Sequence, residues 1–294
     1  MQIVCDANLI TIVSNASGIQ KYSGTILVET PTFLRMYTIS KKVSVESMQS
    51  LRLVVAGAEK LRSEVRDGFE DKFNKTVFEG YGTTETSPGA SVNLPDLESP
   101  YKLRNRPGTV GKAFSGTEFK IVDPDSLESL PTGEDGLILI GGPQIMKGYL
   151  KMPEKTAEVI ELIDGYRWYR TGDKGHLDED GFLTIVDRYS RFAKIGGEMI
   201  SLTRVEEEIL DAFNEKDLEI AATCLPDQRK GEKIVLLSTN NIEKSELKKS
   251  ALKNACLQKL YLKIGEPIPR ILEKSNPNLA KSIRHPVQIQ FWIC

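Results

Sequence analysis

The N-terminal part of the chain alternates short apolar runs with amphipathic segments. The apolar runs lie within residues 25–37, 51–61 and 76–82, and apolar residues at helical spacing cover residues 63–73. This alternation predicts an α/β layer in which a ligand binds near the carboxyl ends of the strands. The segments AGAEK, from Ala56, and EGYGTTE, from Glu79, directly follow two of these strands. We therefore expect both segments to border a binding site.

The pattern changes between about Gly108 and Asp187. Apolar runs are separated there by Gly and Asp residues, as in PTGEDG from Pro131 and KGHLDEDG from Lys174. Turn-forming residues between apolar runs are typical of β-hairpins, and this pattern predicts a small barrel-like subdomain.

A further unit begins after Arg188. Helical spacing is found in residues 201–213 and 244–262, and strand-like runs are found in residues 218–226 and 233–239. We therefore expect a small α+β domain over residues 188–294, after a larger domain over residues 1–187.

Composition and charge narrow the functional classes. The chain has 294 residues, 27% of them charged, and a net charge of −2. This charge gives no electrostatic reason to expect a nucleic-acid partner. No apolar stretch approaches the length that crosses a bilayer, and the start of the sequence lacks a cationic region followed by an apolar one. We therefore expect a cytoplasmic protein without a transmembrane segment. The 4 cysteines are scattered and only 2 histidines are present, so neither a zinc site nor a disulfide framework is indicated.

The segment YGTTE, Tyr81 to Glu85, combines side chains that suit a nucleotide. Tyr81 can cover the face of a base, and Gly82 lets a ligand approach the backbone closely. Thr83 and Thr84 can donate hydrogen bonds to phosphate oxygens, and Glu85 can hold a hard cation. Taken alone, the same five residues are as typical of a surface turn.

Several motifs in fixed order resemble one enzyme superfamily. YGTTE is followed by GEDGLILIGGPQIMKGYLKMPEKT from Gly133, YRTGD from Tyr169, and GFLTIVDRYSRFAKIGGEMIS from Gly181. This set resembles the adenylate-forming, AMP-binding enzymes, which include acyl-CoA synthetases, peptide-synthetase adenylation domains and luciferases. The runs TILVETPTFLRMY, RFAKIGGEMISL and PDQRKGEKIVLL most resemble the acyl-acyl-carrier-protein synthetase part of bifunctional acylglycerophosphoethanolamine acyltransferases. The resemblance covers roughly residues 25–261.

The resemblance implies a ligase with two half-reactions. A carboxylic acid, expected to be a fatty acid, reacts with ATP and Mg²⁺ to give an acyl-adenylate, and a pantetheine thiol of CoA or of an acyl-carrier protein then takes the acyl group. Residues 1–187 would be the C-terminal part of the large adenylation domain, and residues 188–294 a mobile lid with an atypical end. The acyltransferase half of the bifunctional relatives is not visible, so membrane association would come only through a partner domain.

The resemblance also implies roles for individual residues. Glu85 would hold Mg²⁺, Thr83 and Thr84 would contact phosphate, and Gly82 would help to line the acyl pocket. The residues that would surround AMP are Gly57, Ala58, Glu59 and Tyr81 at the adenine and Asp173 and Arg188 at the ribose. Asp173 could instead only close a turn, and Arg188 could be a solvated charge at the end of a strand.

The same resemblance places a hinge and a pantetheine channel after Arg188. The family often has Asp or Lys at the hinge, where this chain has Ser190. Gly196, Gly197 and Glu198 would border the pantetheine channel, because glycines permit close backbone approach and large dihedral changes. An ordinary glycine turn is the alternative reading.

The sequence departs from the family at both ends. The family carries a Ser/Thr/Gly-rich phosphate loop ending in lysine, and no such loop is found upstream of Tyr81. We therefore expect part of the N-terminal adenylation domain to be absent, leaving exposed sheet edge and apolar surface. Near the C-terminus, Lys281 is the candidate for the catalytic lysine, with a solvent-exposed lysine as the ordinary reading. The alternatives to an active ligase are an inactive AMP-binding remnant and a separated subunit completed by an upstream polypeptide.

Overall fold

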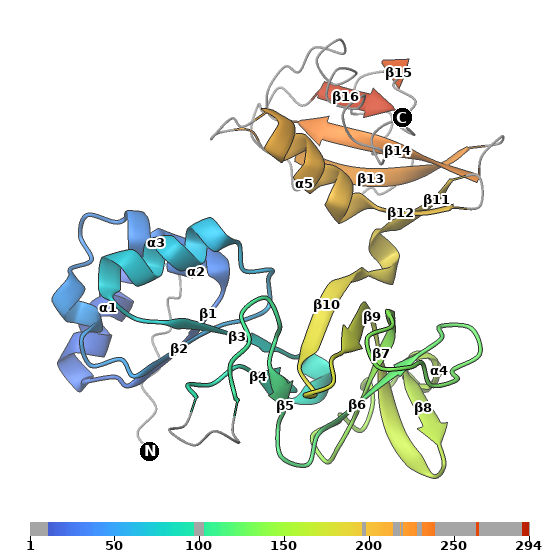
Figure 1. Cartoon of the computed structure of the whole chain (residues 1–294), viewed down its shortest axis with the longest axis horizontal. Helices are drawn as coiled ribbons and strands as arrows, with labels where there is room; N and C mark the ends of the chain where they lie inside the picture. The colour runs from blue at the N-terminus through green and yellow to red at the C-terminus, as the bar shows by residue number, and fades with distance from the viewer. Residues whose placement is uncertain are drawn as a thin grey trace. The chain divides into compact units, whose positions relative to one another are not determined.

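The computed structural model describes residues 11–96, 103–195, 198–213, 218, 220–227, 231–238, 263–264 and 290–293. Contacts within the chain divide it into two compact units, Met1–Val186 (unit 1) and Asp187–Cys294 (unit 2). Figure 1 labels the helices and strands of both units.

Unit 1 contains a sheet that begins as a parallel α/β layer. Its strands are β1 (Ile26–Glu29), β2 (Leu53–Ala56), β3 (Val77–Tyr81), β4 (Ser91–Val92) and β5 (Lys112–Ala113), in that order across the sheet. β1, β2 and β3 pair in parallel, whereas β4 and β5 are antiparallel additions. The α/β prediction for this part is confirmed.

Helices pack against this sheet through a shared apolar core. They are α1 (Ile12–Tyr22), α2 (Pro31–Ile39) and α3 (Ser63–Phe73), with the short η1 (Val45–Met48) between α2 and β2 (Figure 1). The core includes the fully buried Leu34, Tyr37 and Phe69. Helix α1 precedes residues 25–37, the first apolar run identified in the sequence.

The edge of this sheet is exposed. β1 stands at one end of the strand order, and its Ile26 and Val28 side chains are 52% and 68% exposed. Leu27, the residue between them, packs against the core of the helices instead. The exposed Ile26 and Val28 side chains form apolar surface on β1.

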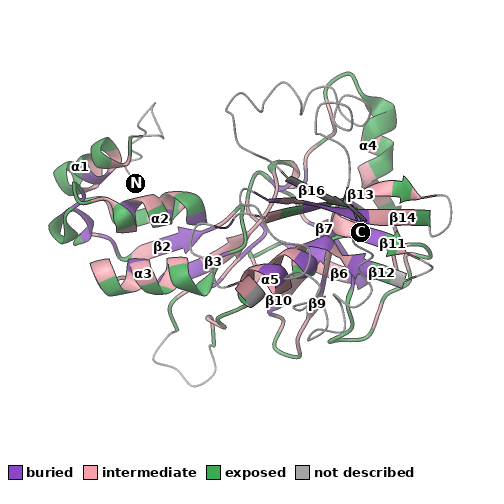
Figure 2. Cartoon of the chain, turned by 90° about the horizontal axis from the view of Figure 1, so that it is seen from above, coloured by how far each residue is buried: buried purple, intermediate pink, exposed green. Residues whose placement is uncertain are grey.

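A second, antiparallel sheet completes unit 1. Its strands are β6 (Glu118–Val122), β7 (Gly136–Gly141), β8 (Ile160–Ile163), β9 (Tyr166–Leu177) and β10 (Leu183–Arg188), and the short helix α4 (Pro153–Val159) precedes β8. The last two residues of β10 belong to unit 2. All residues of β7 are buried, and Figure 2 shows this strand in purple. The pairing order is β10-β9-β7-β6, with β8 on β9. Within the described residues the outer strands β10 and β6 do not pair with each other, whereas Phe182, just before β10, forms a bridge with Lys112 of β5. The barrel-like subdomain stays a prediction.

Unit 2 is a sheet with one described helix. It contains β11 (Phe192–Ile195), β12 (Glu198–Ser201), α5 (Leu202–Phe213), β13 (Ile220–Asp227), β14 (Gly231–Ser238), β15 (Lys263–Ile264) and β16 (Gln290–Ile293). Val205 and Ile209 of α5 and Ile234 of β14 are fully buried together. The helix and strands predicted over residues 201–239 are present, while the helix predicted for residues 244–262 lies outside the described residues.

No helix in the described part of the chain is both long and apolar enough to span a membrane.

Candidate functional site

The YGTTE segment forms a tight turn at the carboxyl end of β3. Gly82 is required there, because a Cβ atom at this position would lie 1.9 Å from the carbonyl oxygen of Pro88. The buried Thr86 closes the turn: its Oγ1 accepts a hydrogen bond from Thr83 N and donates one to Thr83 O, both at 2.9 Å. Thr84 and Glu85 therefore occupy the first positions of η2 (Thr84–Thr86), with Thr84 exposed.

Tyr81 joins this turn to a motif far along the chain. Its Oη donates a hydrogen bond of 2.5 Å to Oδ2 of Asp173, 92 residues away in the sequence. Asp173 is only 3% exposed. Burial and, after it, the charge of Asp173 raise the pKa of Tyr81 far above its ordinary value, so Tyr81 remains a neutral donor. The contact brings two of the predicted site residues together.

A bulge in β9 directs Asp173 toward Tyr81. Leu137 and Leu139 of β7 pair with Lys174 and Arg170, so that the three residues Thr171 to Asp173 stand opposite a single residue of β7. Thr171 Oγ1 donates to Ile138 O at 2.8 Å and accepts from Asp173 N at 2.9 Å. Gly172 has a φ of +76°, which glycine adopts without strain. The TGD motif therefore forms a bulge within the continuous strand β9, and the Asp173 side chain contacts Tyr81.

Glu85 is held by a residue to which sequence reasoning gave no role. Tyr149 Oη donates a hydrogen bond of 2.7 Å to Glu85 Oε1. Burial raises the pKa of Glu85, but the hydrogen bonds from Tyr149 and from backbone N–H outweigh it, so the pKa lies below its ordinary value. Glu85 is therefore an ionised carboxylate at neutral pH. Tyr149 belongs to the motif that begins at Gly133, but only the fold reveals its contact with Glu85.

The residues around Glu85 fit a Mg²⁺ ion that is shared with a nucleotide. Among the described residues, no group of three or more His, Cys, Asp or Glu side chains could hold a metal. Mg²⁺ commonly uses one or two carboxylates together with substrate phosphates, which matches a single Glu85. Thr83 Oγ1 is buried and lies close enough to Glu85 to help lower the pKa of Glu85. That hydroxyl could serve a phosphate oxygen.

The AGAEK segment lies beside the YGTTE turn, as the strand order requires. Gly57 follows β2, its N–H donates to Glu29 O at 3.0 Å, and a Cβ atom on it would lie 3.4 Å from Gly80 O of β3. Ala58 has a φ of +68°, an unfavourable value for a residue with a side chain. Glu59 accepts hydrogen bonds from the N–H and the hydroxyl of Thr32, at 3.3 and 2.7 Å. The contact of these residues with adenine stays a prediction.

The predicted hinge lies at the start of unit 2. Ser190 is in η3 (Tyr189–Arg191), and Arg188 N donates to Asp187 Oδ1 at 2.8 Å. The Asp187 carboxylate accepts hydrogen bonds from Ser201, just before α5, and from Thr203 in its first turn.

The other side of Ser190 is also tied to α5. Arg191 Nη2 forms an ion pair of 2.6 Å with Glu206 Oε2. Gly196, Gly197 and Lys281 lie outside the described residues. Glu198 begins β12, and its predicted role is not tested by its position in that strand.

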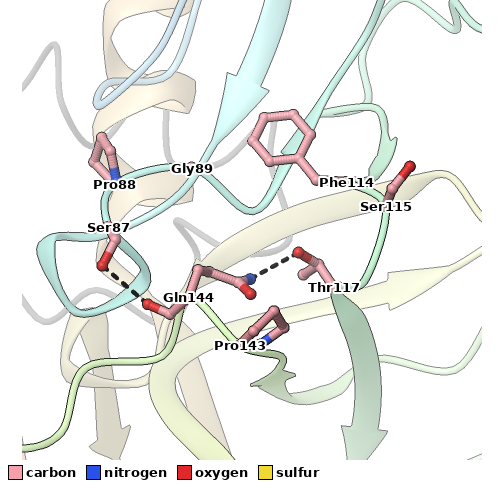
Figure 3. Close-up of a pocket in the computed structure, with 8 residues that line it drawn as sticks. All are labelled: Ser87, Pro88, Gly89, Phe114, Ser115, Thr117, Pro143 and Gln144. Atoms are coloured by element: carbon pink, nitrogen blue, oxygen red, sulfur yellow. Dashed lines mark hydrogen bonds between the residues drawn. The ribbon is translucent and has the colours of Figure 1, made fainter.

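A cavity of about 440 Å³ opens beside the YGTTE turn. Figure 3 shows the residues that line it, which are Ser87, Pro88, Gly89, Phe114, Ser115, Thr117, Pro143 and Gln144. Ser87 Oγ donates to the carbonyl oxygen of Gln144 at 2.9 Å, and Gln144 Nε2 donates to Thr117 Oγ1 at 2.7 Å. A Cβ atom on Gly89 would lie 2.5 Å from the Phe114 ring, so glycine lets this ring approach the backbone.

Unit 1 is thus an α/β layer in which the Tyr81–Asp173 contact and the turn that carries Glu85 lie at the carboxyl end of β3. Residues 8–150 match the model of the AMP-binding enzyme family. This match supports the prediction of the superfamily of AMP-binding, adenylate-forming enzymes.

The individual similarities support the same prediction. The chain is 36% identical over 222 residues to 4-coumarate–CoA ligase 2 of Nicotiana tabacum, covering 75% of this chain and 40% of that protein. It is 35% identical over 189 residues to a 4-coumarate–CoA ligase of Pinus taeda, and the match covers 64% of this chain and 34% of that protein. The crystal structure of ATP-bound MatB from Rhodopseudomonas palustris is similar to this chain, with a TM-score of 0.61 and 29% sequence identity. The match covers 74% of this chain and 42% of the MatB chain.

The chain spans less than two thirds of the length of these relatives, with matches that cover 34% to 50% of the plant ligases. The plant relatives are CoA ligases and do not point specifically to an acyl-carrier-protein synthetase.

Proposed function

We propose that this chain takes part in an acid–thiol ligase reaction, in which ATP activates a carboxylic acid. A carboxylate oxygen attacks the α-phosphorus of ATP, the bond to pyrophosphate breaks, and an acyl-adenylate forms. A thiolate then attacks the acyl carbon, and AMP leaves. The hydrogen bond between Tyr81 and Asp173 carries this proposal, because it brings the YGTTE and TGD motifs into one site.

The AMP half of the site would be built from three neighbouring segments. Asp173 would accept hydrogen bonds from the ribose hydroxyls, for which an ionised carboxylate suits two adjacent donors. Tyr81 would pack against adenine, and its hydrogen bond to Asp173 would fix the orientation of the ring. The segment Gly57–Glu59 would border the base, with the unusual backbone of Ala58 shaping that edge.

The phosphate half of the site would lie at the YGTTE turn. Thr83 and Thr84 would donate hydrogen bonds to phosphate oxygens, and Glu85 would ligate Mg²⁺. When bound, Mg²⁺ supplies neutralisation of the charge on the phosphates. Arg188, Ser190, Gly196, Gly197, Glu198 and Lys281 keep the roles that the family resemblance implies.

We propose CoA as the acyl acceptor and an aromatic acid as the first substrate to test. The support is the similarity to plant 4-coumarate–CoA ligases. The motif resemblance to acyl-acyl-carrier-protein synthetases instead favours a fatty acid and a carrier protein, and both pairs can be assayed side by side. A cytoplasmic location stays our prediction.

Exchange of labelled pyrophosphate into ATP tests the first half-reaction. The full chain should catalyse exchange in the presence of 4-coumarate or of a long-chain fatty acid. The variant Glu85→Gln should lose it, whereas Glu154→Gln, at an exposed position of α4, should retain it. An absence of exchange with every acid tested would overturn ligase activity for this chain.

A second candidate function is supported by the partial coverage of the relatives, because the matches cover only 34% to 50% of the plant ligases. The chain would then bind AMP as an inactive remnant, or would act as a subunit completed by an upstream polypeptide. Calorimetric binding of AMP without pyrophosphate exchange would favour the remnant. Exchange that returns when a polypeptide with the phosphate loop is added would favour the subunit.

A further inference from the structure

The loop that follows β7 is attached to the YGTTE turn at several points. Met146 N donates to the carbonyl oxygen of Glu85 at 2.9 Å, and Tyr149 Oη donates to the Glu85 carboxylate at 2.7 Å. Ser87, two residues further along, donates to Gln144 O at 2.9 Å, as Figure 3 shows. Glu85 is therefore held through both its backbone and its side chain by residues of one loop.

Tyr149 is itself fixed from α4. Its N–H donates to Oγ1 of Thr156 at 2.9 Å, and the Lys155 ammonium lies 5.0 Å from the centre of its ring. Arg167 of β9 binds the same loop by donating to Met146 O at 3.0 Å. The Tyr149 hydroxyl is thus presented to Glu85 by a supported loop, although this side chain has no place in the roles implied by the family resemblance.

From this geometry we infer that Tyr149 is a positioning residue, whose hydroxyl orients the Glu85 carboxylate for a Mg²⁺–nucleotide complex. The inference rests on the proposed function, which gives Glu85 the cation. A hydrogen bond to Oε1 restricts rotation of the carboxylate and so holds its oxygens in one orientation before the cation arrives. Carboxylates that bind metals are generally held by such outer hydrogen bonds, and loss of one typically lowers metal affinity about 10-fold to 100-fold.

A purely structural tether is the alternative, and Mg²⁺ dependence separates the two. The variant Tyr149→Phe removes only the hydroxyl, so the ring, its contact with Lys155 and the backbone bond to Thr156 remain. A positioning residue should affect the gain in ATP affinity that Mg²⁺ provides. A tether should affect ATP binding with and without Mg²⁺ alike.

Calorimetric titration of the full chain with ATP, in Mg²⁺ and separately in EDTA, makes this measurement. In Tyr149→Phe we expect the gain in ATP affinity caused by Mg²⁺ to fall by about 10-fold or more, while affinity in EDTA stays the same. The control Tyr166→Phe removes the hydroxyl of a tyrosine whose ring packs edge-on against Trp168, and it should match the wild type.

Each other outcome has a distinct meaning. An unchanged Mg²⁺ gain in Tyr149→Phe would overturn the inference and leave the proposed function standing. Equal losses in Mg²⁺ and in EDTA would overturn it in favour of a tether. A wild-type chain that binds no ATP would overturn the proposed function, and the inference with it.

Discussion

Replacing Tyr81 by Phe removes one hydroxyl from the centre of the site and leaves the ring in place. That hydroxyl donates to Asp173 at 2.5 Å, and the acceptor is 3% exposed. A hydrogen bond to a charged group contributes about 1.5–3 kcal/mol to stability. We therefore expect the free energy of unfolding of unit 1 to fall by about 2 kcal/mol. In a domain of this size the melting temperature should fall by roughly 4–8 °C.

Tryptophan fluorescence during urea unfolding measures this loss in unit 1 alone. The chain has 2 tryptophans, Trp168 in unit 1 and Trp292 in unit 2. In a Trp292→Phe background, the buried Trp168 on β9 is the single reporter, on the same strand as Asp173. The control Tyr22→Phe, at a 50% exposed position, should change stability by less than about 0.5 kcal/mol.

A double-mutant cycle shows whether the loss belongs to this hydrogen bond. Tyr81→Phe and Asp173→Asn both alter the same bond, so the double variant should lose less stability than the sum of the single losses. Additive losses, or a Tyr81→Phe loss below about 0.5 kcal/mol, would refute the reasoning that this contact organises the site.

Two further predictions concern the turn and its tyrosines. Gly82→Ala should destabilise unit 1 by about 1–3 kcal/mol in the same urea assay, because the new methyl group would lie 1.9 Å from Pro88 O. The control Gly18→Ala places its methyl group in open space and should not destabilise unit 1. Equal losses of stability in the two variants would contradict this explanation. The hydrogen bond to Glu85 raises the pKa of Tyr149 from 10.0 to about 12. Burial raises the pKa of Tyr169 from 10.0 to about 12. The folded state therefore holds these protons more tightly, and the stability they contribute is present below pH 10 and lost as the pH rises toward 12. Urea unfolding across that range should show the decline, with a shallower slope in Tyr149→Phe; an identical slope would contradict the assignment to Tyr149.

Local patterns predicted the elements whose residues show clear periodicity. The apolar runs that became β1, β2 and β3, and the helical spacing that became α3, are visible without any tertiary information. Helix α4 was missed because it has no buried residue, so it has no apolar face to reveal it. A simple turn at Asp173 was the alternative reading of the TGD motif, whereas the fold uses this motif as a bulge within a continuous strand.

Residue patterns alone predicted the site only where its residues are neighbours in sequence, whereas the family resemblance placed Tyr81 and Asp173 around one AMP. The types of residue in YGTTE suggested a nucleotide site, but the contact between Tyr81 and Asp173 joins residues 92 positions apart. The contact of Tyr149 with Glu85 spans 64 positions. Spacing along the chain carries no information on such pairs, because the bulge in β9 and the loop after β7 decide which side chains meet.

Calorimetric titration of the full chain with AMP tests the central claim most directly, since that claim is one nucleotide site built from the YGTTE and TGD motifs. We predict that the wild-type chain binds AMP and that Asp173→Asn weakens binding at least about 10-fold, the equivalent of about 1.4 kcal/mol. Unfolding monitored by Trp168 would verify that the variant remains folded. No binding of AMP by the wild type, or equal binding by a folded Asp173→Asn variant, would contradict the account.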